Sequence, residues 1–344
     1  MTSIVSKTPF PVQGWEHRFY HGNPYHCIAV KVSLQWDAEG RLATMQRQPE
    51  FALNDVWFGK EYLSSLLKAS ELIPFKPATE VVVTGSVRAP EGRPMQKWPI
   101  ALGIGDRTKR LMVYGPRAWQ HRLFDGWTLS APQAVDSVAL LYENAYGGTT
   151  GAAREHYADG EYYAENPAGC GFLGKTRADT SREYPAAQIE TWNGTITKFG
   201  RDYPVGGLGP IPATAPSRFQ HAGTWDEAWK KDMAPHIPLD MDMRYWNAAP
   251  PDQILDDYLK PGTRITLTGM RPGVPITLET PRIDAAVIAR YADSRRQIQP
   301  MELDTIAIDL DKDCMSLRYH TILAFDKTID RIDVLCALLP PRKG

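Results

Sequence analysis

The segment from Tyr25 to Leu34 reads YHCIAVKVSL and alternates apolar with polar residues around a β-branched centre. Such alternation is typical of a strand whose successive side chains point to opposite faces of a sheet. Residues 37–40 follow with turn-forming Asp and Gly, and residues 41–45 form a second short run. We therefore expect a hairpin at this point, within an antiparallel sheet.

Further strand-like runs lie beyond this hairpin and are separated by turns that contain Gly or Pro. Toward the middle of the chain they cover residues 80–87, with Gly85 as a candidate bulge, then 100–104, 110–114 and 138–142. Toward the C-terminus they cover residues 264–268, 275–279, 303–309 and 315–323, the last two joined as a hairpin through residues 311–313. The sequence predicts a mainly β fold (α+β), with antiparallel sheets, long ordered loops and a few short helices.

Three segments have helical patterns. Residues 61–71 place several apolar side chains on one side, and residues 252–259 follow a Pro-Pro pair. A third helix is expected to begin at Thr224, which forms a capping box with the acidic residue three positions later. Trp225 and Trp229 share one face of that helix, and we favour two core anchors over a pair that stacks on a ligand.

The whole chain, residues 1–344, is expected to form one unit with three segments. Residues 1–142 are a predicted N-terminal β lobe, residues 143–262 a loop-rich segment with short helices, and residues 263–344 a C-terminal β segment. Within the middle segment, residues 143–223 have the densest run of loops with Gly and Pro, and an ordered loop region of that length is unusual unless it is functional or contains short elements.

Composition excludes several classes of protein. The chain has 39 Lys and Arg against 40 Asp and Glu, and this balance argues against nucleic acid or an anionic membrane as partner. Because the N-terminus lacks the apolar core of a secretory signal and no apolar run is long enough to cross a bilayer, we expect a cytoplasmic protein without membrane insertion. The four cysteines are far apart in sequence, so we expect neither a disulfide nor a zinc site.

Two motifs suggest a cofactor. Residues 169–176 read GCGFLGKT and match a phosphate-binding pattern, but such a site needs a buried strand before the loop and a helix after it, and neither flank fits. His17, His21, His26 and Cys27 are metal-binding types, but strand alternation places them on different faces. We therefore expect no cofactor and no metal, while a nucleotide-dependent regulator stays open as an alternative.

A pair of carboxylates suggests a second alternative. Asp240 and Asp242 alternate with methionines in an extended segment, so both acids can share one face for acid and base catalysis, as in glycosidases. Structural acids are the more common case. A carboxylate-based hydrolase of a glycan or another small substrate is therefore the alternative function.

Seven motifs follow one another along the chain: FKPATEVVV (75–83), YENAYGG (142–148), NPAGCGF (166–172), LGPI (208–211), GTWDEAW (223–229), PLDMD (238–242) and YWNAAPPDQ (245–253). In this order they resemble the domain of unknown function 2169 (DUF2169) family, accessory proteins of bacterial type VI secretion, over essentially the whole chain. One departure is Asn144, where the family often has arginine.

The resemblance implies a cytoplasmic adaptor or chaperone that acts by binding and not by catalysis. Its partners would be a type VI effector and the spike, which consists of a valine-glycine repeat (VgrG) trimer and its proline-alanine-alanine-arginine (PAAR) tip. The partner-binding positions that the resemblance suggests are Tyr146, Gly147, Gly148, Asn166, Pro167, Gly169, Gly171, Phe172, Trp225, Asp240, Asp242, Trp246 and Asp252.

Overall fold

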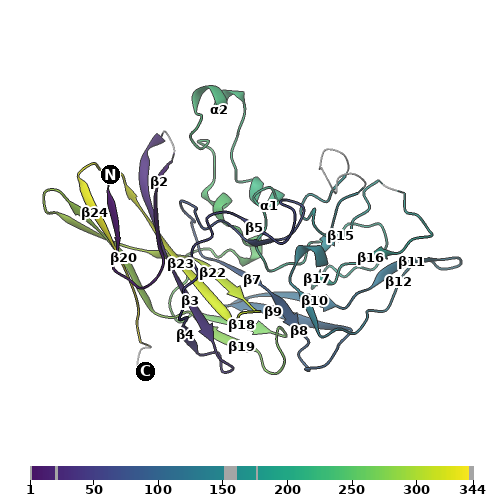
Figure 1. Ribbon diagram of the computed structural model, residues 1–344. Coiled ribbons are helices and arrows are strands. Elements are labelled where there is room, and N and C mark those ends of the chain that lie inside the picture. The colour runs from purple at the N-terminus through teal and green to yellow at the C-terminus, as the bar shows by residue number, and fades with distance from the viewer. Residues whose placement is uncertain (1, 20–21, 151–160, 176, 341–344) are drawn as a thin grey trace.

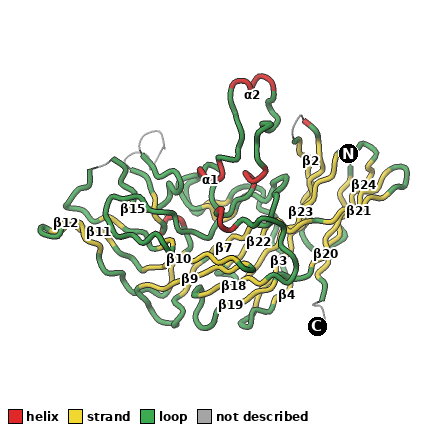
Figure 2. The backbone as a smooth tube through the Cα atoms, turned by 180° about the vertical axis from the view of Figure 1, so that it is seen from behind, coloured by secondary structure: helices red, strands yellow, loops and turns green. Residues whose placement is uncertain are grey.

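The computed structural model describes residues 2–19, 22–150, 161–175 and 177–340, and they form a mainly β protein, as predicted (Figure 1). Three larger sheets make up most of the molecule, and some of the smaller sheets lie at the end away from the termini. Helix α2 (Glu227–Asp232) projects from one side, and the view from behind shows the same projection (Figure 2).

The six-stranded sheet is built on the segment that the alternating pattern identified. Its order is β2-β3-β23-β22-β7, with β4 paired to β3, and only the β22–β7 pair is parallel. Both predicted hairpins, β3–β4 and β22–β23, are confirmed. The strands are β2 (Val12–Arg18), β3 (Pro24–Trp36), β4 (Leu42–Thr44), β7 (Glu80–Thr84), β22 (Glu302–Asp309) and β23 (Cys314–Ala324).

Two further sheets pack beside it, and strands from the first and last parts of the chain share them. The five-stranded sheet has the order β17 (Ile189–Thr191), β10 (Arg107–Tyr114), β9 (Lys97–Ile104), β18 (Arg264–Thr268) and β19 (Ile276–Glu279). The four-stranded sheet has the order β1 (Ser3–Ser6), β24 (Ile329–Leu338), β20 (Ile283–Tyr291) and β21 (Arg296–Pro300).

The remaining elements are short. The small sheets pair β5 (Val56–Trp57) with β6 (Leu66–Lys68), β8 (Ser86–Arg88) with β13 (Ser137–Ala139), β14 (Tyr146–Gly147) with β15 (Cys170–Gly171), and β11 (Ala118–Arg122) with both β12 (Gly126–Leu129) and β16 (Tyr184–Pro185). The helices are α1 (Pro216–Phe219), α2 (Glu227–Asp232) and 3₁₀ turns at Tyr142–Asn144, Met243–Trp246 and Pro251–Gln253.

The predicted helix over residues 61–71 is wrong. Tyr62 has a left-handed backbone with φ of 62°, which no helix interior accommodates, and Leu66–Lys68 pair as β6. The Ser65 backbone N–H and hydroxyl both donate to the carboxylate of Glu143, so contacts far away in sequence fix this segment. Spacing of apolar residues alone does not separate a helix from a bent loop that leads into a strand.

The predicted helix over residues 252–259 is also wrong, since only its first residues form the 3₁₀ turn. Beyond it, Ile254 bridges Glu80 and the Leu255 N–H donates to the Thr79 carbonyl at 2.9 Å, so the chain runs extended along β7. Gly85 is no bulge: with φ of 96° it separates β7 from β8, where a Cβ would lie 2.9 Å from the backbone nitrogen of Asp311.

The inner faces of the three larger sheets share one apolar core. The long central strands contribute alternate residues to it, as the period of two requires. On β3 these are Ile28, Val30, Val32 and Leu34, all with no exposed surface. Three of the four cysteines are buried and Cys170 is half-buried, and all four are free thiols.

The opposite face of the six-stranded sheet is buried too, but it is polar. Lys31, Glu80, Asp304, Arg318 and His320 are each at least nine-tenths buried there. Lys31 lies 2.7 Å from Glu71, Glu80 lies 2.5 Å from Lys76, and Arg318 contacts Asp304, whose carboxylate also lies 2.9 Å from His320 Nδ1. This polar layer is permissible only because each buried charge is paired and hydrogen-bonded.

Asp304 has no exposed surface and is the anion at the centre of this layer. Burial alone would raise its pKa, but Arg318 and His320 together hold the pKa of the carboxyl well below its usual range. Its pairing therefore stabilises the fold fully above the pKa of an unfolded aspartate, about 3.9, and that stabilisation is lost as the pH falls through the lowered folded pKa.

We predict that Arg318→Leu destabilises the protein by about 3–5 kcal/mol, because it leaves the Asp304 charge buried without its main partner. Urea unfolding followed by tryptophan fluorescence measures the change. Arg93→Leu is the control: its ion pair with Glu91 is exposed, so its cost is expected to stay below about 1 kcal/mol. Equal costs for the two substitutions would contradict the assigned role.

Candidate functional site

The motifs at residues 142–148 and 166–172 form one structural unit. Strands β14 and β15 pair in parallel, with Tyr146 opposite Cys170 and Gly147 opposite Gly171. The Phe172 N–H extends the ladder by donating to the Gly147 carbonyl at 2.9 Å. The two motifs therefore meet backbone to backbone although they are separated along the chain.

Asn166 is the centre of this unit. Its side chain is buried, and Nδ2 donates to the carbonyls of Tyr142 at 2.9 Å and Tyr146 at 3.0 Å. Its own carbonyl accepts the Gly148 N–H at 2.8 Å. Pro167 lies in the turn that follows. A buried side-chain amide that satisfies carbonyls in this way is a structural clamp.

The glycines of these motifs are required by close approach of the backbone. A Cβ on Gly147 would lie 2.1 Å from the Asn166 carbonyl oxygen, and one on Gly148 would lie 2.7 Å from the Gly169 oxygen. A Cβ on Gly169 would lie 2.5 Å from Asn166 Nδ2, and Gly171 has φ of 96°. The glycine pattern therefore reflects packing of the chain against itself.

The same geometry explains the phosphate-binding match. The loop follows the two-residue strand β15 and leads to β16, so no helix N-terminus faces it among the described residues. The Lys175 N–H donates to the Glu161 carboxylate at 2.6 Å, an anion from the chain itself, and its side chain is exposed. Thr176 lies outside the described residues. No observation here favours a nucleotide site.

Tyr146 and Phe172 belong to an aromatic cluster beside this unit. The Tyr146 hydroxyl donates to Asp202 at 2.8 Å, and its ring meets Tyr163 edge to face at 5.2 Å between centroids. Burial, aided by Asp202, raises the pKa of Tyr146 far above its usual value. Phe172 lies 5.7 Å from the Tyr163 ring. Both side chains stabilise the interior.

The motif at residues 245–253 packs against strand β7. One carboxylate oxygen of Glu80 accepts the backbone N–H groups of Ala248 at 2.7 Å and Ala249 at 3.0 Å, and Asn247 Nδ2 at 3.2 Å. Gln253, fully buried, donates Nε2 to the Val81 carbonyl at 2.7 Å and to the Leu208 carbonyl at 2.9 Å.

Two predicted site residues lie at the edges of this contact. Trp246 is half-buried and meets His17 edge to face at 6.4 Å between ring centroids. Asp252 is exposed and accepts from Lys109 Nζ at 2.7 Å. Burial lowers the pKa of Lys109, while Asp252 acts in the opposite direction. Lys109 also borders a cavity of about 270 Å³ where three motifs converge through Tyr142, Ile211, Pro250 and Pro251.

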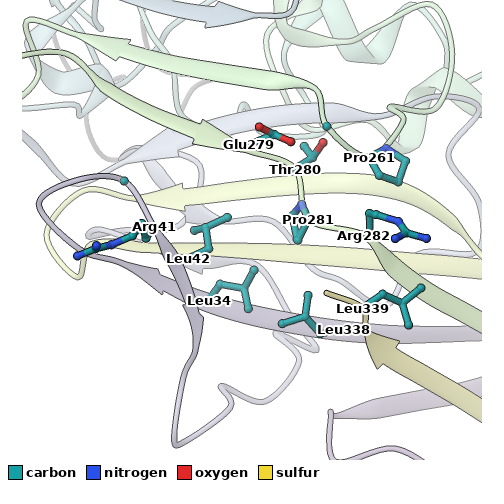
Figure 3. Close-up of a pocket in the computed structure, with 12 residues that line it drawn as sticks. Leu34, Arg41, Leu42, Pro261, Glu279, Thr280, Pro281, Arg282, Leu338 and Leu339 are labelled. Carbon is teal, nitrogen blue, oxygen red and sulfur yellow. The ribbon is translucent and has the colours of Figure 1, made fainter. Parts of the chain in front are cut away.

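A larger groove, of about 770 Å³, opens between β3, β4 and the strands near the C-terminus (Figure 3). Its walls carry Leu34, Leu42 and Leu338, and Arg41 and Arg282 lie at its sides. None of the predicted site residues lines it. The groove and the motifs are therefore separate features of the surface.

The segment at residues 223–242 is an arm that carries α2 away from the sheets (Figures 1 and 2). The N-cap of α2 is Asp226, whose side chain accepts the Trp229 N–H at 2.8 Å, and not Thr224 as predicted. The Thr224 backbone N–H and hydroxyl instead donate to Asp240, at 3.0 and 2.7 Å. Asp240 thereby connects the outgoing and returning segments of the arm at its base.

The prediction that the two tryptophans are core anchors is wrong. Trp225 is 46% exposed, Trp229 is half-buried, and α2 has no buried residue. Their rings pack on each other with centroids 4.4 Å apart, and each indole N–H donates to a backbone carbonyl of the arm. The arm projects away from the core, so Trp225 is exposed and Trp229 is only half-buried.

The two aspartates of the arm are already engaged. Hydrogen bonds from Thr224 lower the pKa of Asp240, and the Arg244 guanidinium and backbone N–H lower that of Asp242. A glycosidase pair needs one carboxyl with a raised pKa to act as acid. Neither carboxyl of the pair therefore has the raised pKa that the acid in such catalysis needs.

Sequence reasoning did not identify Glu80 as a site residue. The sequence does place this charged residue directly before three valines of a predicted buried strand. A charge at such a position needs partners in the interior, which is the pattern that could have identified it. Among the described residues no group of three His, Cys, Asp or Glu is arranged to hold a metal ion, and His21 lies outside them.

Comparison with known proteins gives one match. A family model with the description "Uncharacterized protein conserved in bacteria (DUF2169)" matches residues 21–320, most of the chain. No curated protein and no solved structure matches. Within the described part of the chain, no helix has the length and apolar character needed to cross a membrane.

We predict that Gly147→Ala destabilises the fold by at least about 2 kcal/mol, because its Cβ would collide with the Asn166 carbonyl oxygen. Gly92→Ala is the matched control, since Gly92 also has positive φ but no atom within 4 Å of the added Cβ. It should cost only about 1 kcal/mol. Thermal and urea unfolding of both variants test the difference, and similar losses would refute the close-packing argument.

Proposed function

Because this chain belongs to the DUF2169 family, we propose that it is a cytoplasmic adaptor that binds a type VI secretion effector and helps to load it onto the VgrG and PAAR spike. The observation that carries the proposal is the projecting arm. Within the family motif at residues 223–229, it presents Trp225 to solvent and keeps Trp229 half-buried against it, away from the core.

Trp225 and Trp229 form an apolar surface on the arm, with ring centroids 4.4 Å apart. Trp is enriched among the few residues that carry most of the binding energy of an interface, and it loses little conformational entropy on binding. Leu239, 55% exposed, lies on the returning segment of the arm. Phe219, 58% exposed, is the last residue of α1, shortly before the arm begins. These side chains offer apolar surface to a partner.

The polar residues of the arm complete an interface of the usual kind. Glu227, Lys230 and Asp232 are exposed on α2 and carry both signs of charge. Specific complexes bury roughly 800 Å² on each partner, with an apolar centre and a polar rim. The arm supplies both parts, and its aspartates serve to hold its shape, which favours binding over the alternative of a carboxylate-based hydrolase.

We predict that Trp225→Ala abolishes recovery of an effector, VgrG or PAAR protein when the tagged full-length chain is purified from its own host and analysed by quantitative mass spectrometry. Removing a central Trp anchor typically costs at least about 2 kcal/mol, a loss of about thirtyfold in affinity. The wild-type protein should recover at least one of these partners.

Trp192→Ala is the matched control, because Trp192 is 45% exposed and lies at the end of β17, outside the arm. It should leave recovery unchanged, and the melting temperatures of both variants should match that of the wild type. Absence of every secretion component from the wild-type purification, under conditions of active secretion, would refute the proposed function. An equal loss with Trp192→Ala would refute the role of the arm.

A further inference from the structure

A second projecting element lies at the end of the molecule away from the termini. Strands β11 and β12 form a hairpin whose tip carries Leu123, 86% exposed, and Phe124, 94% exposed. No other large apolar side chain in the described part of the chain is as exposed. Contiguous exposed apolar residues on a soluble protein mark interaction sites more often than chance placement.

The turn itself does not require these residues. Arg122 pairs with Gly126, which leaves a three-residue loop, and Gly126 has the positive φ of 67° that such a hairpin needs. None of residues 123–125 has a positive φ that would restrict its residue type, and small polar residues are common in turns. Because the fold gains nothing from Leu123 and Phe124, their apolar character points to a role outside the chain.

The base of the hairpin is rigid. Trp127 on β12 stacks on Phe199 with centroids 3.9 Å apart and planes 20° from parallel, and it meets Tyr184 edge to face at 5.5 Å. Trp119 on β11 is buried and also contacts Phe199, at 5.7 Å. A tip on such a base is held in one orientation, which reduces the entropic cost of binding.

The charges beside the tip indicate the class of partner. Arg122 and Asp125 are both exposed and flank Leu123 and Phe124 with opposite signs. A segment that inserts into an anionic membrane surface carries an excess of Lys and Arg, and this tip has no such excess. A balanced rim around an apolar centre fits a protein pocket, where each charge meets a complementary group.

We propose that the β11–β12 tip inserts Leu123 and Phe124 into an apolar pocket of a folded partner protein, and that this partner differs from the one bound by the arm. The inference rests on the proposed adaptor function, since loading requires two proteins to be held at once. Figures 1 and 2 show α2 and the hairpin projecting from different parts of the molecule, so two partners can bind together.

The test uses the full-length chain with a photo-crosslinking phenylalanine analogue at position 124, expressed in its own host. The crosslinked protein is identified by mass spectrometry, purified and titrated against wild type, the double variant Leu123→Ser/Phe124→Ser, Trp225→Ala and Val274→Ser. Val274, 79% exposed in the segment between β18 and β19, is the matched control for loss of exposed apolar surface.

We expect the double variant to weaken binding of the crosslinked protein at least tenfold, while Val274→Ser and Trp225→Ala change it less than twofold. The tip is fully exposed, so the melting temperature should not change. Equal affinity of all variants, crosslinking only to a second copy of this chain, absence of any crosslinked protein, or tip-dependent sedimentation with phosphatidylglycerol vesicles would each overturn the proposal. If the tip variants bind as the wild type does while recovery that depends on Trp225 is retained, the second docking site is refuted and the adaptor function stands. If no secretion protein is recovered but a partner that depends on the tip is, the adaptor function is refuted and only the contact made by the tip remains.

Discussion

The buried carboxylate of Glu80 is the interaction on which the arrangement of the loops depends. It is paired with Lys76 within its own segment and accepts three N–H groups from residues 247–249, about 170 positions later in the chain. A charge removed from water must keep every such partner, because losing one leaves part of the desolvation cost uncompensated. The loop that carries Ala248 therefore has one acceptable position over β7, and the segments on either side of it are placed accordingly.

The strands that the sequence predicts well are those with one apolar face in the shared core. Residues 303–309 and 315–323 alternate clearly, and the strand bounds predicted there lie within one or two residues of those of β22 and β23. The polar face of the same sheet could not be recognised as buried, because Lys31 and Arg318 find their partners only in the folded chain. The prediction of a helix at residues 61–71 is wrong for the same reason, because the position of Ser65 depends on its hydrogen bond to the distant Glu143.

For the candidate site, the sequence identifies the motifs but not the contacts that hold them together in the fold. Glycines in a G-x-G pattern are consistent with a bound phosphate or with another stretch of backbone, and only the position of Asn166 decides between them. The arm shows the converse difficulty. Two tryptophans four residues apart are the pattern of a buried helix face, and their exposure follows from the projection of α2, which no local pattern encodes.

The order of strands in the six-stranded sheet also bears on how the protein is made. Strands β22 and β23 lie between β3 and β7, yet they are translated after more than 200 further residues. Until β22 and β23 have been synthesised, β3 and β7 each have an unpaired edge in this sheet. The six-stranded sheet can therefore close only after residue 324 has been synthesised, because the β7–β22 and β3–β23 pairs join residues more than 200 positions apart.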